Sequence, residues 1–309
     1  MDIRQLVTFR MVAATLSFTQ AANALGYVQS SVTAQIQALE ADLGVPLFDR
    51  LGKRISLTDA GHRLLKYAEQ ILTLMDEARS VVGSNEEPSG TLAFSAPESL
   101  CAYRLPPVLR AFRERYPQVQ LVFRPSPSSD MQRRVSEGLI DLAFMVDEPI
   151  QSVNLRVETL VHEALLILAS PEHPLTARNE VRVADLAGEP MLLTEAGCTY
   201  RSLFERVLTE GGVYPPTTLE FGSVEAIKQC VMTGMGLTFL PAMTVSRELA
   251  EDRLMALRWA GPPFAMLTQM IYHKDKWVSP ALAAFIELAR QMVQSEGLEQ
   301  PGRTRESPR

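Results

Sequence analysis

The chain has few of the features that mark secreted or membrane proteins. It contains three cysteines among 309 residues and no C-x-x-C pair, which argues against a disulfide framework and against a zinc site. No stretch approaches 18 consecutive apolar residues, so no segment is expected to span a membrane. The first fifteen residues intersperse Asp2, Arg4 and Arg10 among apolar side chains and do not resemble a secretory signal. These absences predict a cytoplasmic protein with no membrane partner.

The motifs of common enzyme classes are missing as well. The four histidines are scattered, and the chain has no H-E-x-x-H, no G-x-S-x-G and no P-loop. Gly234-Met-Gly236 lacks the third glycine of a dinucleotide fingerprint and is better explained as a tight turn between a helix and a strand. We therefore predict no catalytic residue, no metal site and no cofactor. An enzyme remains an unfavoured alternative.

The most informative pattern lies within residues 1–58. Ser17 stands three residues before Gln20, the spacing of a capping box at a helix start, and Gly26 can end that helix with a positive φ. A second helix and a short hairpin with several cations follow. This order predicts a winged helix-turn-helix, whose second helix enters the DNA major groove. The buried face of that second helix is predicted to consist of Val32, Ile36 and Leu39.

The opposite face of the second helix carries short polar side chains. Glutamine can pair bidentately with adenine, and hydroxyl groups can donate to or accept from several base edges. The alternative to a base-reading role is that this is an ordinary solvated helix face. Helix N-termini and the cations of the hairpin are expected to contact phosphates. The predicted DNA-binding residues are Gln29, Ser30, Ser31, Thr33, Gln35 and Gln37 on the helix and Arg50, Lys53 and Arg54 in the hairpin.

This module is short of positive charge. Neither Lys nor Arg occurs between Arg10 and Arg50, and the whole chain has a net charge of −6. Non-specific attraction to phosphate should therefore be weak, and any footprint on DNA has to be local. A weak single module also favours several linked copies acting on one site.

Residues 59–90 are predicted to form a linker helix followed by a hinge. Thr58 can cap the start of the helix, and the polar stretch 83–90 ends it. Apolar residues repeat at spacings of four and three, which favours a coiled-coil dimer. The alternative is an amphipathic helix packed on its own domain. The seam consists of Leu64, Ala68, Ile71, Met75, Ala78 and Val82.

From residue 91 onward strands and helices alternate, which indicates βαβ units with parallel sheets. We predict two α/β lobes with the architecture of periplasmic binding proteins, lobe I from 91–161 and 267–294, lobe II from 162–266, and a disordered tail at 295–309. On this half alone, a solute-binding protein is a second alternative. Strands are expected at 91–95, 119–123, 142–146, 164–169, 191–194, 237–240 and 266–272, and helices at 105–116, 130–137, 200–210, 223–233 and 280–294.

Small ligands of such folds bind in the crevice at the carboxyl ends of strands. Four loops that we expect at strand ends carry hydroxyl groups near helix N-termini, which favour an anion or a carboxylate. These loops are residues 95–101, 125–129, 194–199 and 222–223. Each hydroxyl taken alone is also explained as an ordinary helix cap. Together the loops predict a small anionic effector bound between the lobes. The predicted effector-binding residues are Ser95, Ser99, Cys101, Ser128, Thr194, Cys198, Thr199 and Ser223.

Several motifs resemble those of the LysR-type transcriptional regulators. The resemblance rests on Gln29–Gly44, Pro46-Leu-Phe-Asp-Arg50, Leu57-Thr-Asp-Ala-Gly61, Glu137–Phe144 and His173-Pro-Leu175, and it extends over essentially the full chain. It implies a regulator that binds double-stranded promoter DNA as a homodimer or homotetramer under the control of a small effector.

The chain departs from the family pattern in its second helix. The family often has basic residues near positions 34 and 37, whereas this sequence has Ala34 and Gln37. The resemblance therefore implies the docking mode but not which bases are read.

The loop around Cys198 has two further resemblances. Thr194-Glu-Ala-Gly-Cys198 resembles the loop with the peroxidatic cysteine in the OxyR branch of the family, but the partner cysteine would fall near Val207, which is no thiol. A redox-responsive regulator acting through Cys198 and Cys101 is thus an alternative to the ligand-responsive one. Glu195–Arg201 also resembles a subgroup linked to sulfur assimilation, which tilts the expected effector toward sulfur compounds.

Overall fold

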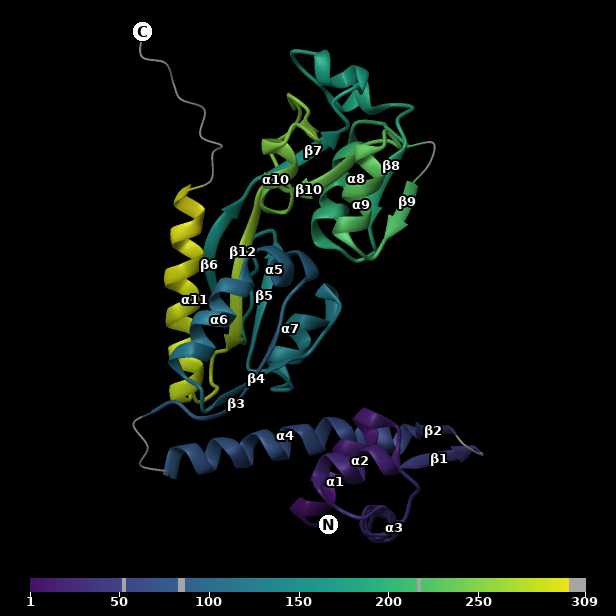
Figure 1. The fold of residues 1–309 in the computed structure, drawn as a ribbon, viewed down its shortest axis with the longest axis vertical. Coiled ribbons are helices and arrows are strands. Elements are labelled where there is room, and N and C mark those ends of the chain that lie inside the picture. Colours follow the sequence, from purple (N-terminus) through teal and green to yellow (C-terminus); the bar gives the residue numbers. More distant parts are fainter. Residues whose placement is uncertain (52–53, 83–86, 216–217, 300–309) are drawn as a thin grey trace. The chain divides into compact units, whose positions relative to one another are not determined.

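The computed structural model describes residues 1–51, 54–82, 87–215 and 218–299 (Figure 1). The chain divides into two compact units, unit 1 from Met1 to Glu86 and unit 2 from Glu87 to Arg309. Across the described ranges, no helix has the length and apolar character needed to cross a membrane.

Unit 1 is a three-helix core followed by a hairpin and a long helix. Asp2 caps the first helix in a capping box with Gln5, and Ser17 accepts a hydrogen bond from the backbone N–H of Gln20 at the start of the second. Gly26 has φ 69° and ends that helix in the left-handed region, as predicted. The elements are α1 (Ile3–Thr15), α2 (Phe18–Leu25), α3 (Gln29–Leu43), β1 (Phe48–Leu51), β2 (Arg54–Leu57) and α4 (Asp59–Val82).

The core of unit 1 ties the hairpin to the helices. The ring of Phe48 lies 5.4 Å from that of Phe9 and 6.0 Å from that of Phe18, so the first strand packs on α1 and α2. Gly61 is needed where α4 passes the hairpin, because a Cβ there would lie 2.2 Å from the carbonyl oxygen of Leu47. The predicted inner face of α3 is confirmed, since Val32, Ile36 and Leu39 are fully buried.

The linker helix α4 begins as predicted, with the Thr58 hydroxyl accepting from the N–H of Gly61 at 3.0 Å. Its first half packs against its own unit: Ala68 is fully buried, and Leu64 and Ile71 contact the same core. The predicted seam is therefore partly occupied within one chain. Leu74, further along the helix, is 66% exposed.

Unit 2 contains two lobes. Lobe I is built on a five-stranded sheet in the order β4-β3-β5-β12-β6, with α5, α6, α7 and α11 beside it (Figure 1). The pairs of β3 with β4 and β5 are parallel, whereas β12 pairs antiparallel with β5 and β6. The elements are β3 (Gly90–Ser95), α5 (Glu98–Tyr103), α6 (Leu105–Arg115), β4 (Val119–Phe123), α7 (Ser128–Ser136), β5 (Leu142–Asp147), β6 (Leu155–Glu163), β12 (Met266–His273) and α11 (Pro280–Glu299).

Lobe II contains two small sheets. One has the antiparallel order β10-β7-β11, and the other pairs β8 with β9 in parallel. The elements are β7 (Leu165–Ala169), η1 (Pro174–Ala177), η2 (Val183–Leu186), β8 (Met191–Thr194), α8 (Thr199–Glu210), β9 (Thr218–Phe221), α9 (Val224–Met232), β10 (Thr238–Pro241), η3 (Ala242–Thr244), α10 (Ser246–Ala250) and β11 (Met255–Ala256).

Strands β6 and β12 run between the lobes, and a buried ion pair stands beside them. Arg104, between α5 and α6, lies with its guanidinium 2.8 Å from the Glu163 carboxylate, and both side chains are nearly inaccessible. The Thr268 hydroxyl donates to the same carboxylate. Since removing one partner would leave a buried charge, the pair fixes β6, β12 and the α5–α6 junction to one another.

Three predictions about unit 2 are wrong. The sheets are not wholly parallel, because β12 returns against β5 and the β7 sheet is antiparallel. The predicted loop from Ser95 to Cys101 contains the short helix α5. Residues 295–299 belong to α11, which continues because Pro301 is the first proline after its start. The rest of the predicted tail, 300–309, lies outside the described residues.

Candidate functional site

The outer face of α3 presents most of the predicted DNA-binding side chains of the helix. Gln29, Ser30 and Gln37 are exposed, and Ser31 and Thr33 are partly so. The N-terminus of α3 follows Val28, which is 69% exposed and provides no side-chain cap. The first turn of α3 therefore has no side-chain acceptor of its own, which suits a contact with phosphate.

Gln35 is placed differently from the other polar residues of α3. Its side-chain oxygen accepts a hydrogen bond of 2.7 Å from the hydroxyl of Thr8, a fully buried residue of α1. A bidentate contact with adenine needs both the oxygen and the nitrogen of the amide. The side-chain oxygen of Gln35 is thus already engaged in a contact between α3 and α1.

The hairpin after α3 is positioned by an acidic residue that is not among the predicted site residues. The Glu40 carboxylate accepts hydrogen bonds from the N–H groups of Leu47, at 2.8 Å, and Phe48, at 3.3 Å. This anion joins the end of α3 to the start of the hairpin. Lys53, predicted to contact phosphate, lies outside the described residues, as do the side chains of Arg50 and Arg54.

Unit 2 has a cleft of about 660 Å³ at the carboxyl ends of β3, β4, β8 and β9. All four predicted loops contribute to its lining. Five predicted effector residues line it: Ser99, Cys101, Ser128, Thr194 and Cys198. Three others are not in the lining: Ser95 is fully buried in β3, Thr199 donates to the carbonyl of Val146, and Ser223 is exposed at the start of α9.

Two hydroxyl groups of the cleft are buried without a partner. Ser99 is 2% exposed and Thr194 is 5% exposed, and within the described chain neither hydroxyl oxygen has a hydrogen-bond partner. An unsatisfied buried hydroxyl costs free energy, so native proteins hold few of them. Two such hydroxyls in the lining of one cleft indicate a place where a ligand supplies the missing hydrogen-bond partners.

Three helices of at least nine residues begin at this cleft. The starts of α7, α8 and α9 contribute Ser128, Tyr200 and Val224 to the lining. None of the three helices has a side-chain hydrogen bond capping its N-terminus. The structure therefore does not support the interpretation of these hydroxyls as ordinary helix caps, which applied to Ser128, Thr199 and Ser223. These helix ends carry partial positive charge toward the cleft.

The cleft also holds two carboxylates that are not among the predicted effector-binding residues. Glu98 and Glu195 are both exposed in its lining, which includes no Lys or Arg among the residues described. Partial burial, and next the negative charge of Glu195, raise the pKa of Glu98. In the sequence, each acid is the direct neighbour of a predicted effector-binding residue, Glu98 of Ser99 and Glu195 of Thr194. This adjacency is the feature of the sequence that could have indicated them.

The two cysteines of the cleft are poor nucleophiles. Burial, and after it the negative charge of Glu98, raises the pKa of Cys101 to about 11. Burial likewise raises the pKa of Cys198. Reactive cysteines need a lowered thiol pKa, so the structure does not favour the redox alternative.

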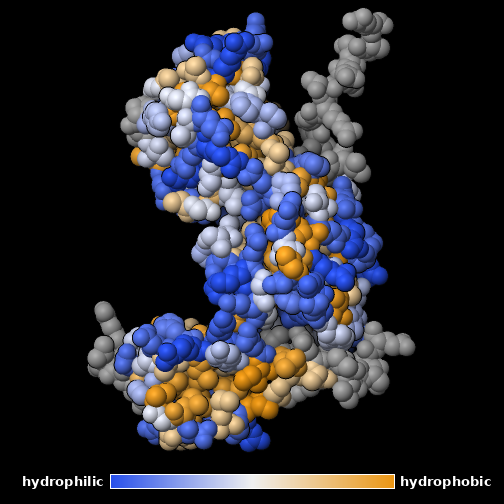
Figure 2. Space-filling view, turned by 180° about the vertical axis from the view of Figure 1, so that it is seen from behind, coloured by the Kyte–Doolittle hydropathy of each residue, from blue (hydrophilic) through white to orange (hydrophobic). Residues whose placement is uncertain are grey.

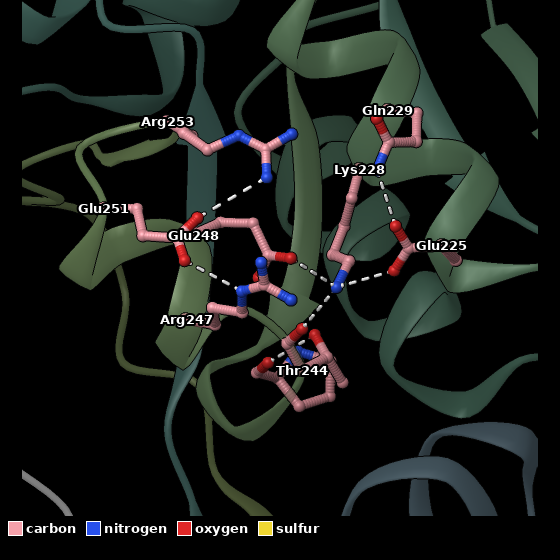
Figure 3. A network of polar contacts seen from close by, with 9 residues as sticks. Glu225, Lys228, Gln229, Thr244, Arg247, Glu248, Glu251 and Arg253 are labelled. Atoms are coloured by element: carbon pink, nitrogen blue, oxygen red, sulfur yellow. Dashed lines mark hydrogen bonds and ion pairs between the residues drawn. The ribbon is translucent and has the colours of Figure 1, made fainter.

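A second hollow of about 400 Å³ lies at the C-terminal end of α5 and beside the first half of α9, and Lys228 lines it (Figure 3). The ammonium group of Lys228 lies 2.8 Å from Glu225 and 2.9 Å from Glu248, and donates to the carbonyl of Thr244 at 3.1 Å. It also lies 5.2 Å from the centre of the Tyr103 ring in α5. Although burial lowers it, hydrogen bonds to Glu225 and Glu248 raise the pKa of Lys228 above its ordinary value.

Comparison with known proteins gives matches over both units. The family described as "bacterial regulatory helix-turn-helix protein, lysR family" matches residues 3–62, and the "LysR substrate binding domain" matches residues 85–294. The chain is 44% identical over 292 residues to the uncharacterized HTH-type transcriptional regulator YwqM of Bacillus subtilis, covering 94% of this chain and 99% of that protein. It is 33% identical to the regulator GltR of the same organism, over 95% of this chain and 98% of that protein.

Solved structures share the fold. Full-length CbnR complexed with its target DNA has a TM-score of 0.67 at 24% identity, over 94% of this chain and 100% of that one. A full-length OxyR variant from Pseudomonas aeruginosa has a TM-score of 0.72 at 22% identity, over 100% and 99%. The predicted fold class is confirmed, and the solute-binding and enzyme alternatives are set aside. The chain belongs to the LysR family of bacterial transcriptional regulators.

Proposed function

We propose that this regulator acts in the cytoplasm as a dimer or tetramer, reads promoter DNA with the outer face of α3, and responds to an effector bound in the cleft of unit 2. The observation that carries the proposal is the cleft itself. It gathers the ends of four strands, three uncapped helix N-termini and the two unpartnered hydroxyls of Ser99 and Thr194.

The exposed polar row on α3 supports the DNA-reading role. Gln29 is exposed at the N-terminal end of α3, the end at which a recognition helix contacts base edges. The Thr33 hydroxyl donates to the carbonyl of Gln29 at 3.0 Å, and its oxygen can still accept. CbnR, whose fold this chain shares, was solved on its target DNA.

The surface of unit 1 supports assembly. The face shown in Figure 2 carries a broad apolar area. Exposed apolar side chains stand on α1 and α4, with Ile3 of α1 44% exposed and Tyr67 and Leu74 of α4 60% and 66% exposed. Apolar area of this kind is usually covered by a partner. A second copy of the same unit would cover it and place two α3 helices on one DNA site.

Binding to DNA can be tested with the full-length protein. We expect it to retain particular fragments of the genome that encodes it, and Gln29→Ala to bind the best of them about ten-fold more weakly, because a good bidentate base contact is worth about 1–3 kcal/mol. Gln120→Ala, on the exposed edge of β4, is the matched control. Equal affinity of Gln29→Ala and the control in fluorescence anisotropy at fixed salt would remove α3 from the base-reading role.

A further inference from the structure

The polar groups of the cleft in unit 2 are of two opposite kinds, and they restrict the charge of the effector. One kind is acidic. Glu98 follows β3 in lobe I, and Glu195 follows β8 in lobe II, so a carboxylate enters the cleft from each lobe. Both carboxylates line the same cleft, and the negative charge of Glu195 contributes, after partial burial, to the raised pKa of Glu98.

Two other charged groups act on Glu98, but they do not neutralise the negative charge of Glu98 and Glu195. Lys228 is the cation and Glu225 is a further anion. The ammonium group of Lys228 is already held between Glu225 and Glu248, at 2.8 and 2.9 Å. Its charge is therefore shared by two other carboxylates, and the pair in the cleft remains short of a cation.

The second kind of group donates hydrogen bonds. The hydroxyls of Ser99 and Thr194 are buried in the lining and lack partners among the described residues. The N-termini of α7, α8 and α9 begin there without side-chain caps. Hydroxyl and backbone N–H donors at helix starts are the usual partners of a carboxylate.

We propose that the effector is a small zwitterion of the amino-acid type, with its ammonium group between Glu98 and Glu195 and its carboxylate on Ser99, Thr194 and the helix N-termini. This inference rests on the proposed function of the cleft. A purely anionic ligand would bring its charge against two carboxylates, and a purely cationic one would leave the donors unsatisfied. The volume of about 660 Å³ is typical of a small-molecule site.

The proposal also gives the effector a mechanical role. The ammonium group would bridge acids of different lobes and so favour the arrangement in which Glu98 and Glu195 are close. A ligand shifts a conformational equilibrium only by the difference in its affinity for the two states. The bridging contact supplies that difference.

Four compounds with the same five-carbon skeleton test the charge requirement: pentanoate, pentylamine, norvaline and 5-aminopentanoate. Binding to the full-length protein is measured by calorimetry at neutral pH. We expect at least one of the two zwitterions to bind more tightly than both pentanoate and pentylamine, by about ten-fold, the value of one additional charge-assisted contact. A preference for pentanoate, or the same result for all four compounds, weak or absent binding included, overturns the proposal.

Variants locate the ammonium group. In the double variant Glu98→Gln/Glu195→Gln we expect the preference for the zwitterion over pentanoate to disappear, because the acids are replaced by neutral side chains of the same shape. Glu210→Gln, at the exposed end of α8 and outside the cleft, is the matched control and should retain the preference. A preference that survives in the double variant places the ammonium elsewhere and overturns the assignment.

Retention of genomic fragments is measured in the same preparations. A protein that binds its DNA but shows no zwitterion preference contradicts only the inference about the effector. A protein that binds no fragment contradicts the proposed function, whatever the calorimetry shows.

Discussion

The two hollows of unit 2 are both lined by residues of the helices α5 and α9, but they differ in whether their polar groups have partners within the protein. In the hollow at Lys228, the cation contacts two carboxylates and a backbone carbonyl (Figure 3). It also lies 5.2 Å from the centre of the Tyr103 ring. In the cleft, the same two helices contribute Glu98, Ser99 and Val224, the acids have no cation in the lining, and the hydroxyl of Ser99 has no partner among the described residues.

This difference separates a structural cluster from a binding site. Groups that satisfy one another stabilise the fold and leave nothing for a ligand, whereas unsatisfied groups cost stability that a ligand can return. Because α5 and α9 border both hollows, the Lys228 cluster holds in place the two helices whose N-terminal residues line the cleft. The comparison predicts that changes at Lys228 alter stability and that changes in the cleft alter ligand response.

The largest expected effect is that of Lys228→Met on stability. Glu248 is 6% exposed and would keep its charge without its partner, so we expect the free energy of unfolding to fall by about 3–5 kcal/mol, the usual cost of breaking a buried ion pair. Urea denaturation of the full-length protein measures it. Lys228→Met/Glu248→Met should recover part of the loss, because no buried charge remains. Arg247→Met, which removes an exposed ion pair with Glu251, is the control and should change little.

Equal stability of Lys228→Met and Arg247→Met would show that the cluster is not structural. The hollow at Lys228 would then no longer differ from the cleft as a cluster that stabilises the fold.

The thiol of Cys101 reports on the electrostatics of the cleft, and its expected effect is the next in size. A pKa near 11 instead of 9.0 lowers the thiolate fraction about a hundred-fold at a given pH below both values. In a Cys198→Ser/Cys230→Ser background, we expect the alkylation rate of Cys101 to rise about ten-fold per pH unit beyond pH 9.0, since the thiolate fraction follows the pKa. The slope is independent of access to the thiol. A plateau near or below pH 9.0 would contradict a thiol that is buried beside the negative charge of Glu98.

Removing the unpartnered hydroxyls should separate stability from ligand response. Ser99→Ala and Thr194→Val delete buried polar atoms without hydrogen bonds, so we expect the free energy of unfolding to stay the same or rise by about 1 kcal/mol. Binding of the zwitterion identified by calorimetry should weaken several-fold, because its carboxylate loses a donor. Thr233→Val, which removes a hydroxyl bonded to the carbonyl of Cys230, is the control and should leave binding unchanged. A clear loss of stability in the cleft variants would show that these hydroxyls already have partners.

Local pattern predicted much of this fold. Strands β4 and β8 have the bounds expected from their apolar runs, 119–123 and 191–194, and Thr58 and Gly26 act at helix ends as their chemistry predicts. The six-residue helix α5 was missed because a segment of that length has no readable period.

The candidate site was less predictable, because it depends on which segments meet. The strand-end rule selected all four loops of the cleft, although it also selected Ser95, which faces the interior of β3. Nothing local indicates that Glu98 and Glu195 line the same cleft, since they are almost a hundred residues apart and belong to different lobes. The contact of Gln35 with Thr8 likewise requires α1 to pack on α3. The expected anion is thus refined to a carboxylate that is accompanied by a cation.

The smallest expected effect is the pH dependence that Glu98 gives to stability. Its pKa is raised in the folded protein, so the folded state binds this proton more tightly than the unfolded state does. Stability from this group is therefore present below the ordinary glutamate pKa and is lost as the pH rises through the folded value. Glu98→Gln has no such loss, so its stability relative to the wild-type protein should increase from pH 4.5 toward neutrality, measured by urea denaturation at each pH. Glu210→Gln should show no such trend. If the stability of Glu98→Gln relative to the wild-type protein instead decreased as the pH rises, Glu98 would already have a cationic partner. The two hollows would then differ less than their geometry indicates.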